Sequence, residues 1–161
     1  MIAALELMSL FLVVATVIPS VAHALELPGK LRLTREQYLA VQPIYYPGFT
    51  LIGAAEPLSI LILAGLAVAT PRGTISFWLI VGALSAAVLT HLLYWTVTAP
   101  VNKVWLNRET LSGGAQRFFR AGASLDESDW SILRDRWERS HLYRAASSVS
   151  ALMLLSVAVL R

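Results

Sequence analysis

The stretch SFWLIVGALSAAVLTHLLYWTVT, residues 76–98, contains no Lys, Arg, Asp or Glu. A helix needs about 20 apolar residues to cross the roughly 30 Å hydrocarbon core of a bilayer, and this stretch is long enough. It lacks the alternation of apolar and polar residues that is typical of a barrel strand. Because only helices and closed barrels satisfy their backbone groups in lipid, residues 76–98 are predicted to form a transmembrane helix.

Three further apolar stretches accompany it, at residues 2–24, 49–69 and 142–160. Each is close to the length that spans a bilayer, although the last contains Arg144. Ser124-Leu-Asp-Glu127 has the capping-box pattern of a helix start. The last helix is therefore predicted to begin near residue 125, well before its apolar part.

The composition is typical of a membrane protein and excludes several other classes. Hydrophobic residues make up 57% of the chain and charged residues 14%, with a mean hydropathy of +0.64. Soluble domains have about 45–50% and about 25% respectively. The chain has no cysteine, which excludes disulfides, iron–sulfur clusters and thiolate chemistry. The net charge of +3 does not indicate a nucleic-acid partner, because the basic residues cluster beside apolar stretches.

The basic side chains are distributed unevenly among the connections. Residues 25–48 and 99–141 together hold ten Lys and Arg, whereas the remaining connection and the ends contribute only Arg72 and Arg161. By the positive-inside rule, the basic connections face the cytoplasm and both termini face outward, which is the periplasm for a bacterial inner membrane. The sequence thus predicts a single all-α domain over residues 1–161. It is an antiparallel four-helix transmembrane bundle whose long last helix protrudes into the cytoplasm.

Local patterns bear on where the first and third helices end. Ala22-His23-Ala24 resembles a signal-peptidase site, but no basic residue precedes the apolar core and Glu6 lies within it, so we expect a retained membrane helix. Pro28 and the glycine after it are predicted to end that helix. The third helix is expected to end near Pro100, in which case Asn102 lies beyond it.

Four ionisable side chains are predicted to lie in the cytoplasmic half of the bundle: His23, Glu56, His91 and His141. Counting about 1.5 Å per residue from each helix entry brings all four to similar depths. An ionisable group at membrane depth costs a few kcal/mol, roughly, and is by default a functional candidate. We therefore expect one shared site near the inner interface.

A metal site is one alternative for these residues. Glu138-Arg-Ser-His141 is a Glu-x-x-His pair of the kind that di-iron bundles use, and His23 and Glu26 have the reverse spacing. The complete speculative ligand set is His23, Glu26, Glu56, His91, Glu138 and His141, which suits a single iron, manganese or zinc ion. Only one Glu-x-x-His pair is present, however, so a site without any metal stays open. Haem bound by His91 with His23 or His141 is a further alternative.

Two non-enzymatic classes also remain. A small transporter or proton relay is disfavoured because the chain has neither internal repeats nor paired broken helices. A structural or accessory subunit of a larger membrane complex, or a homo-oligomer, is compatible with every pattern above. Its polar side chains would then only pair with one another inside the bundle.

The segment Gln42-Pro-Ile-Tyr45-Tyr46-Pro47-Gly48 precedes the second helix. Tyrosines are amphipathic and are common at the membrane interface. They are interpreted as an aromatic anchor, with a lid over the inner site as the alternative.

Two motifs resemble those of a known family. One is Pro100-Val-Asn102 after the third apolar stretch, and the other is Trp137-Glu-Arg-Ser-His141-Leu-Tyr-Arg144 at the head of the last. Together with the histidine at the end of the first helix, they resemble the anthrone-oxygenase-like family of small four-helix membrane proteins, most of which have no assigned function. Named members oxidise polycyclic anthrones to anthraquinones with molecular oxygen, without a bound cofactor.

The resemblance implies a site built from Asn102, Trp137, His141 and Arg144, to which His91 is added as a catalytic candidate. A histidine acts as general base on an acidic C–H next to a carbonyl, and the resulting carbanion reacts with oxygen. Tyr94, Trp95 and Trp137 are expected to hold a flat hydrophobic small molecule that arrives from the membrane lipid. The expected function is thus an oxygenase-like oxidoreductase.

Overall fold

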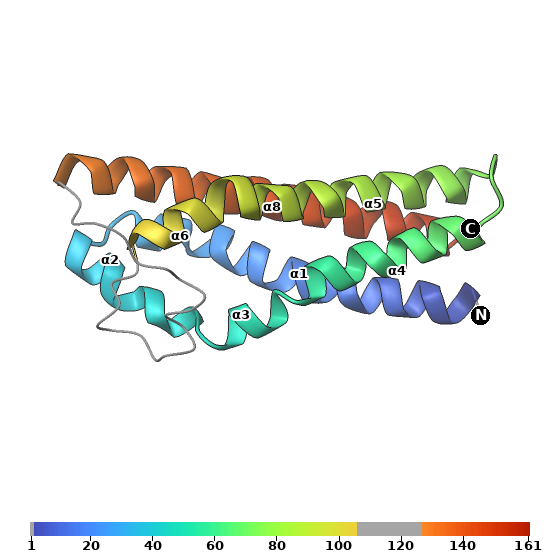
Figure 1. The fold of residues 1–161 in the computed structure, drawn as a ribbon, viewed down its shortest axis with the longest axis horizontal. Helices are drawn as coiled ribbons and strands as arrows, with labels where there is room; N and C mark the ends of the chain where they lie inside the picture. Colours follow the sequence, from blue (N-terminus) through green and yellow to red (C-terminus); the bar gives the residue numbers. More distant parts are fainter. Residues whose placement is uncertain (1, 106–126) are drawn as a thin grey trace.

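The computed structural model describes residues 2–105 and 127–161, and every regular element in these ranges is helical. Four long helical rods lie side by side along the long axis of the molecule (Figure 1). Both termini lie at one end together with the short connection of residues 70–74, and we call this the terminal end. The opposite end, where the chain forms several short helices, we call the α2 end.

Four helical spans are long and apolar enough to cross a membrane: Ile2–Lys30, Gly48–Ala69, Ile75–Asn102 and Trp130–Val159. The elements are, in order, α1 (Ile2–Lys30), α2 (Arg35–Val41), η1 (Gln42–Tyr45), α3 (Gly48–Ile52), α4 (Ala55–Ala69), α5 (Ile75–Leu93), the π-helical η2 (Tyr94–Thr98), α6 (Ala99–Trp105) and α8 (Glu127–Val159). The prediction of an all-α four-helix bundle is confirmed.

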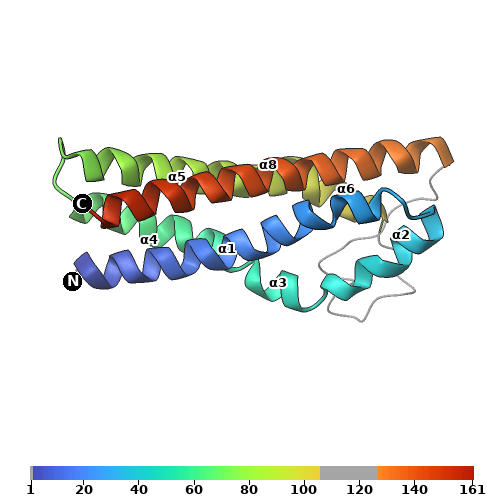
Figure 2. The same ribbon diagram turned by 180° about the vertical axis from the view of Figure 1, so that it is seen from behind.

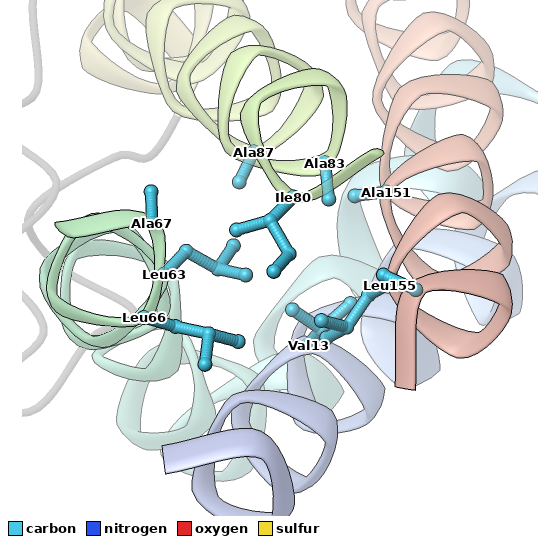
Figure 3. Close-up of a cluster of buried hydrophobic side chains, with 10 residues drawn as sticks. Val13, Leu63, Leu66, Ala67, Ile80, Ala83, Ala87, Ala151 and Leu155 are labelled. Atoms are coloured by element: carbon cyan, nitrogen blue, oxygen red, sulfur yellow. The ribbon is translucent and has the colours of Figure 1, made fainter. Parts of the chain in front are cut away.

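The helices pack in the cyclic order α1, α4, α5, α8, so that each long rod contacts two neighbours. The view from behind shows α8 lying along both α5 and α1 (Figure 2). At the terminal end, side chains from all four rods point toward one another in an apolar core (Figure 3). Its members are Val13, Leu63, Leu66, Ala67, Ile80, Ala83, Ala87, Ala151, Leu155 and Ala158. The alanines let the backbones approach closely, as is usual between membrane helices.

The first helix continues past the point at which it was predicted to end. Pro28 lies inside α1, which runs to Lys30 and closes with hydrogen bonds from Leu31 N to Leu27 O and from Arg32 N to Gly29 O. A proline removes one backbone hydrogen bond, and ion pairs made by the Lys30 side chain offset that loss. The prediction was wrong because it ignored this tertiary contact. Its consequence is that Lys30 lies inside the bundle.

The third rod also continues through its proline. Residues Tyr94–Thr98 form a π-helical turn in which Ala99 N donates to Tyr94 O, five residues back. The wider turn needs no hydrogen bond from Pro100, and the chain goes on as α6. The expected end near Pro100 was wrong, and Asn102 belongs to the same rod as His91. π-turns of this kind are frequent at functional sites.

The second rod, predicted as one helix over residues 49–69, is broken at Gly53 and Ala54 between α3 and α4. Pro57 has no N–H for the Gly53 carbonyl, which instead accepts from Glu56 N at 3.1 Å. A Cβ on Gly53 would lie 3.2 Å from Thr50 O, so the tight turn favours glycine. The break places Glu56 in the first turn of α4.

The last helix is unbroken from Glu127 to Val159, as predicted. The capping box at Ser124 and the connection before it lie outside the described residues. At the α2 end, Thr34 caps α2: its hydroxyl accepts from Gln37 N, and the Gln37 side chain accepts from Thr34 N. This capping box fixes the start of α2 directly after α1.

Candidate functional site

A cavity of about 310 Å³ lies between the four rods in the half of the bundle toward the α2 end. Residues from α1, η1, α3, α4, α5, η2, α6 and α8 line it. It receives all the residues that were predicted to be catalytic or substrate-binding: Tyr94, Trp95, His91, Asn102, Trp137, His141 and Arg144. His23 and Glu56 line it too, so the four ionisable residues that the depth count grouped share one cavity.

Glu56 is the centre of a buried ion-pair network on one wall. Its Oε1 accepts a short hydrogen bond from Arg144 Nη2 of α8. Its other oxygen lies 3.2 Å from His91 Nδ1 at the end of α5. The Trp95 indole N–H in turn donates to His91 Nε2 at 3.0 Å. Since Nε2 accepts, the proton of the His91 imidazole is on Nδ1, where it is donated to Glu56.

Lys30 is the centre of a second network, next to the first. It is only 4% exposed, and its Nζ lies 3.1 Å from Glu26 Oε2 and 3.6 Å from Glu138 Oε1. The same Nζ lies 3.2 Å from His23 Nδ1. The sequence analysis missed Lys30, although Glu26 and Lys30 are four residues apart and would have been paired on a helix continued through Pro28.

Two tyrosines join the short helices to this second network. Tyr38 of α2 donates to Glu138 Oε1 at 2.7 Å, and Tyr45 of η1 donates to Glu26 Oε2 at 2.7 Å. Burial, followed by the nearby carboxylates, raises the pKa of both phenols above the ordinary value, so both stay donors at neutral pH. Of the tyrosines weighed as an anchor or a lid, Tyr45 lines the cavity.

An aromatic stack connects the two networks. The rings of His23 and His141 lie 4.1 Å apart at 36°, and Trp137 packs against His141 with ring centroids 4.1 Å apart. The Trp137 indole N–H donates to Asn102 Oδ1 at 2.7 Å, which fixes the plane of the tryptophan. Asn102 reaches Trp137 only because the third rod continues through Pro100.

Three buried nitrogen atoms of the lining residues have no hydrogen-bond partner among the described residues: Gln42 Nε2, His141 Nε2 and Arg144 Nε. A buried donor without a partner costs about 1–3 kcal/mol. Such an unsatisfied group is expected where a ligand completes the site. Gln42, on η1, was also missed, because nothing in the sequence distinguishes it from a loop glutamine.

The predicted metal ligands do not assemble. Within the two described ranges, no three His, Asp or Glu side chains gather closely enough to hold a metal ion. Glu26 and Glu138 lie outside the cavity lining and are engaged by Lys30, while Glu56 is engaged by Arg144. Both nitrogens of His91, the expected haem ligand, are hydrogen-bonded within the protein. These residues do not fit a resident metal or haem, and no step below involves one.

No protein-family model, curated protein or solved structure matches this chain. The resemblance to the anthrone-oxygenase-like family therefore stays a prediction from Pro100–Asn102 and Trp137–Arg144.

Proposed function

We propose that the cavity carries out an oxygenase-like oxidation of a flat, apolar small molecule that bears a carbonyl group and enters from the membrane. One observation carries the proposal: a histidine whose Nδ1–H is donated to a buried carboxylate lines an aromatic cavity of suitable size. Pockets for small ligands have volumes of about 300–1,000 Å³, and the cavity, at about 310 Å³, is within this range.

His91 is the general base of this proposal. The Glu56 carboxylate accepts from Nδ1 at 3.2 Å, which orients the ring and leaves the lone pair on Nε2. In the resting protein Nε2 accepts the Trp95 indole N–H. Trp95 is 57% exposed and can turn away without leaving a void in the bundle, so a bound substrate C–H takes its place at Nε2.

The reaction needs molecular oxygen as its only co-reactant. His91 removes one proton from a methylene group conjugated to the carbonyl, and the carbanion adds O₂ to give a hydroperoxide once protonated. Loss of the second methylene hydrogen with the outer oxygen, as water, leaves a new C=O. The methylene carbon loses four electrons, O₂ gains them, one oxygen atom stays in the product and the other leaves as water.

The site lies in the cytoplasmic half of an inner membrane in this proposal, because the α2 end carries the basic connections. Tyr94, Trp95 and Trp137 supply flat apolar surfaces for a polycyclic substrate. A substrate of this kind partitions into lipid, so a membrane-embedded cavity meets it at high local concentration.

The test uses the purified full chain in phospholipid vesicles with anthrone as the probe. We expect oxygen uptake and quinone formation above the rate of empty vesicles, with one ¹⁸O atom from ¹⁸O₂ in the product. His91→Gln is expected to lower the rate by about 10²–10⁴-fold, the usual share of a general base. Trp78→Phe, at an exposed position near the start of α5, serves as the control and keeps the full rate. A rate equal to that of empty vesicles, or a His91→Gln variant as active as the wild type, would disprove the proposal.

A non-catalytic accessory subunit is the second candidate. It is favoured by the complete pairing of Glu56 with Arg144 and of Lys30 with Glu138, which a purely structural role also requires. In that case anthrone turnover is absent, and extraction from native membranes in a mild detergent yields the chain in a defined complex with another membrane protein.

A further inference from the structure

We propose that His23 and His141 form a pair of neutral Nε2–H donors, locked in that tautomer by Lys30 and Arg144, and that the pair binds a ligand oxygen that carries or develops negative charge. The tautomers follow from the geometry of the chain alone. The role of the oxygen in turnover rests on the proposed function.

Lys30 determines the tautomer of His23. A lysine ammonium has three donors and no acceptor, so the nitrogen 3.2 Å from Nζ, which is His23 Nδ1, must offer its lone pair. The two carboxylates of Glu26 and Glu138 next to Nζ keep the lysine charged and therefore donating. The single proton of the neutral His23 ring must then be on Nε2.

Glu26 is the one competitor for His23 Nδ1. Its Oε2 lies 3.7 Å from that nitrogen, beyond hydrogen-bond distance, and only 3.1 Å from Lys30 Nζ. The lysine is thus inserted between the imidazole and the carboxylate that would otherwise accept an Nδ1–H. Removing the ammonium should let Glu26 draw the proton to Nδ1.

Arg144 acts on His141 in the same way. The guanidinium has only donors, and its Nη1 lies 3.5 Å from His141 Nδ1, one turn back on α8. An Nδ1–H would point at a cation, so the proton of His141 is on Nε2. Arg144 is itself held by Glu56, which fixes the guanidinium in place.

The two rings present their donors together. Their centroids are 4.1 Å apart, both residues line the cavity, and neither Nε2 has an acceptor within the described part of the chain. His141 is 3% exposed and His23 6%, so water does not freely replace the missing acceptor. Two aligned N–H donors backed by two cations have the arrangement that stabilises an oxyanion.

The third histidine has the opposite arrangement. His91 donates from Nδ1 to a carboxylate and keeps its lone pair on Nε2, whereas the pair keeps lone pairs on Nδ1 and protons on Nε2. The cavity therefore separates a base from a donor pair. This reverses the expected role of His141, which becomes an oxyanion donor rather than the base, with Lys30 as its neighbour's positioning residue.

The test is a ¹⁵N NMR measurement of imidazole tautomers on the full chain in lipid vesicles, labelled at histidine. The chain has three histidines, so single substitutions assign every signal. We expect two rings with a proton on Nε2 and one, His91, with a proton on Nδ1. A spectrum in which His23 or His141 carries its proton on Nδ1, or is doubly protonated at neutral pH, would overturn the inference.

Lys30→Met provides the matched perturbation, with Arg32→Met as its control. Arg32 is exposed two residues away, so its replacement removes the same charge without touching His23. We expect Lys30→Met to move the His23 proton to Nδ1 and Arg32→Met to leave all three tautomers unchanged. An unchanged His23 tautomer in folded Lys30→Met would show that the lysine does not position it.

Ligand binding is tested with 2-naphthol against naphthalene. We expect 2-naphthol to shift the Nε2–H signals of His23 and His141 and naphthalene to leave them in place; equal shifts with both would refute the oxygen-binding role. These measurements need no turnover, so they can succeed while anthrone oxidation fails, and the reverse outcome would remove this inference and leave the oxygenase proposal standing.

Discussion

The two halves of the same four helices are stabilised by different interactions. Toward the terminal end, the rods meet through a dry cluster of alanine, leucine and isoleucine with no charged member. Toward the α2 end, the same rods meet through buried charges, above all Lys30 with Glu138 and Arg144 with Glu56. The difference shows that the fold needs no polar contact to bring the helices together, so the charges at the α2 end require another explanation.

The physical cost of the two halves differs as well. Small residues in the apolar half contribute close packing, which is the main attraction between helices when lipid surrounds them. A buried ion pair is seldom more stabilising than a well-packed apolar pair, because desolvation offsets most of the Coulomb energy. A protein that keeps two such pairs around a cavity is therefore retaining them for what they position.

Breaking the ion pair at the cavity should have the largest effect on stability. Arg144→Leu leaves the Glu56 carboxylate buried without its cation, since both residues are less than 10% exposed. We expect a loss of about 3–5 kcal/mol in the free energy of unfolding, measured by SDS titration in mixed micelles. In the double variant Glu56→Leu/Arg144→Leu no charge is stranded, and the loss should be smaller than in either single variant. If the double variant loses the sum of both, the pair stabilises the fold directly and the contrast between the halves fails.

Removing the hydroxyl of Tyr38 should have the next largest effect. Tyr38→Phe deletes a 2.7 Å hydrogen bond to the Glu138 carboxylate, worth about 1.5–3 kcal/mol for a bond to a charged group. Burial, and then Glu138, raise the pKa of the Tyr38 phenol, so the folded protein holds this proton more tightly than the unfolded chain does. That contribution is fully present below the unfolded tyrosine pKa of about 10 and declines as the pH rises above it.

The pH dependence gives the control for this prediction. Wild type should lose stability between neutral pH and pH above about 10 more steeply than Tyr38→Phe. Tyr143→Phe, at an exposed position on α8, should follow the wild type. Parallel curves for wild type and Tyr38→Phe would show that the phenol does not support the α2 end.

Overpacking tests the apolar half. Ala83 is fully buried where α5 faces α8, and Ala83→Leu should separate the two helices at a cost of about 1–3 kcal/mol. Ser85→Leu, exposed two residues further along α5, should have little effect. Anthrone oxidation should survive Ala83→Leu in the fraction that remains folded; its complete loss there would contradict the separation of packing and chemistry between the halves.

The smallest expected effect is at the junction of the two halves. Thr98 of η2 and Ser140 of α8 are 2.9 Å apart, and Ser140 donates onward to Trp137 O at 2.6 Å. A double-mutant cycle of Thr98→Val and Ser140→Ala should give a coupling of about 0.6 kcal/mol, the average for such bonds between membrane helices. The cycle of Ser140→Ala with Thr96→Val, whose hydroxyl bonds within its own helix, should give none.

Much of the architecture could be predicted from apolar runs and charge. The four spans were found because about 20 apolar residues in a row have few other stable states in water or lipid. The sharing of one cavity by His23, Glu56, His91 and His141 also followed, because rise per residue fixes depth along a helix. Helix ends at Pro28 and Pro100 were misplaced, since a proline's effect depends on what the neighbouring helix offers in return.

The pairing of the polar residues could not be predicted in the same way. Glu26 and Glu138 were proposed as metal ligands, and the structure instead turns them toward Lys30. Nothing in the linear spacing says that the Tyr38 hydroxyl, exactly 100 residues from Glu138 in sequence, donates to its carboxylate. Such contacts depend on the rotation of each helix about its axis, which packing in the whole bundle determines.

The sequence by itself determined how many helices this protein has, how long they are and at what depth its ionisable residues lie, because hydropathy and helical rise are local properties. Only the tertiary structure decided which nitrogen of each histidine faces a cation and which faces a carboxylate. That choice depends on angstrom-scale distances between side chains from different helices, and it separates the base from the donors in the proposed site.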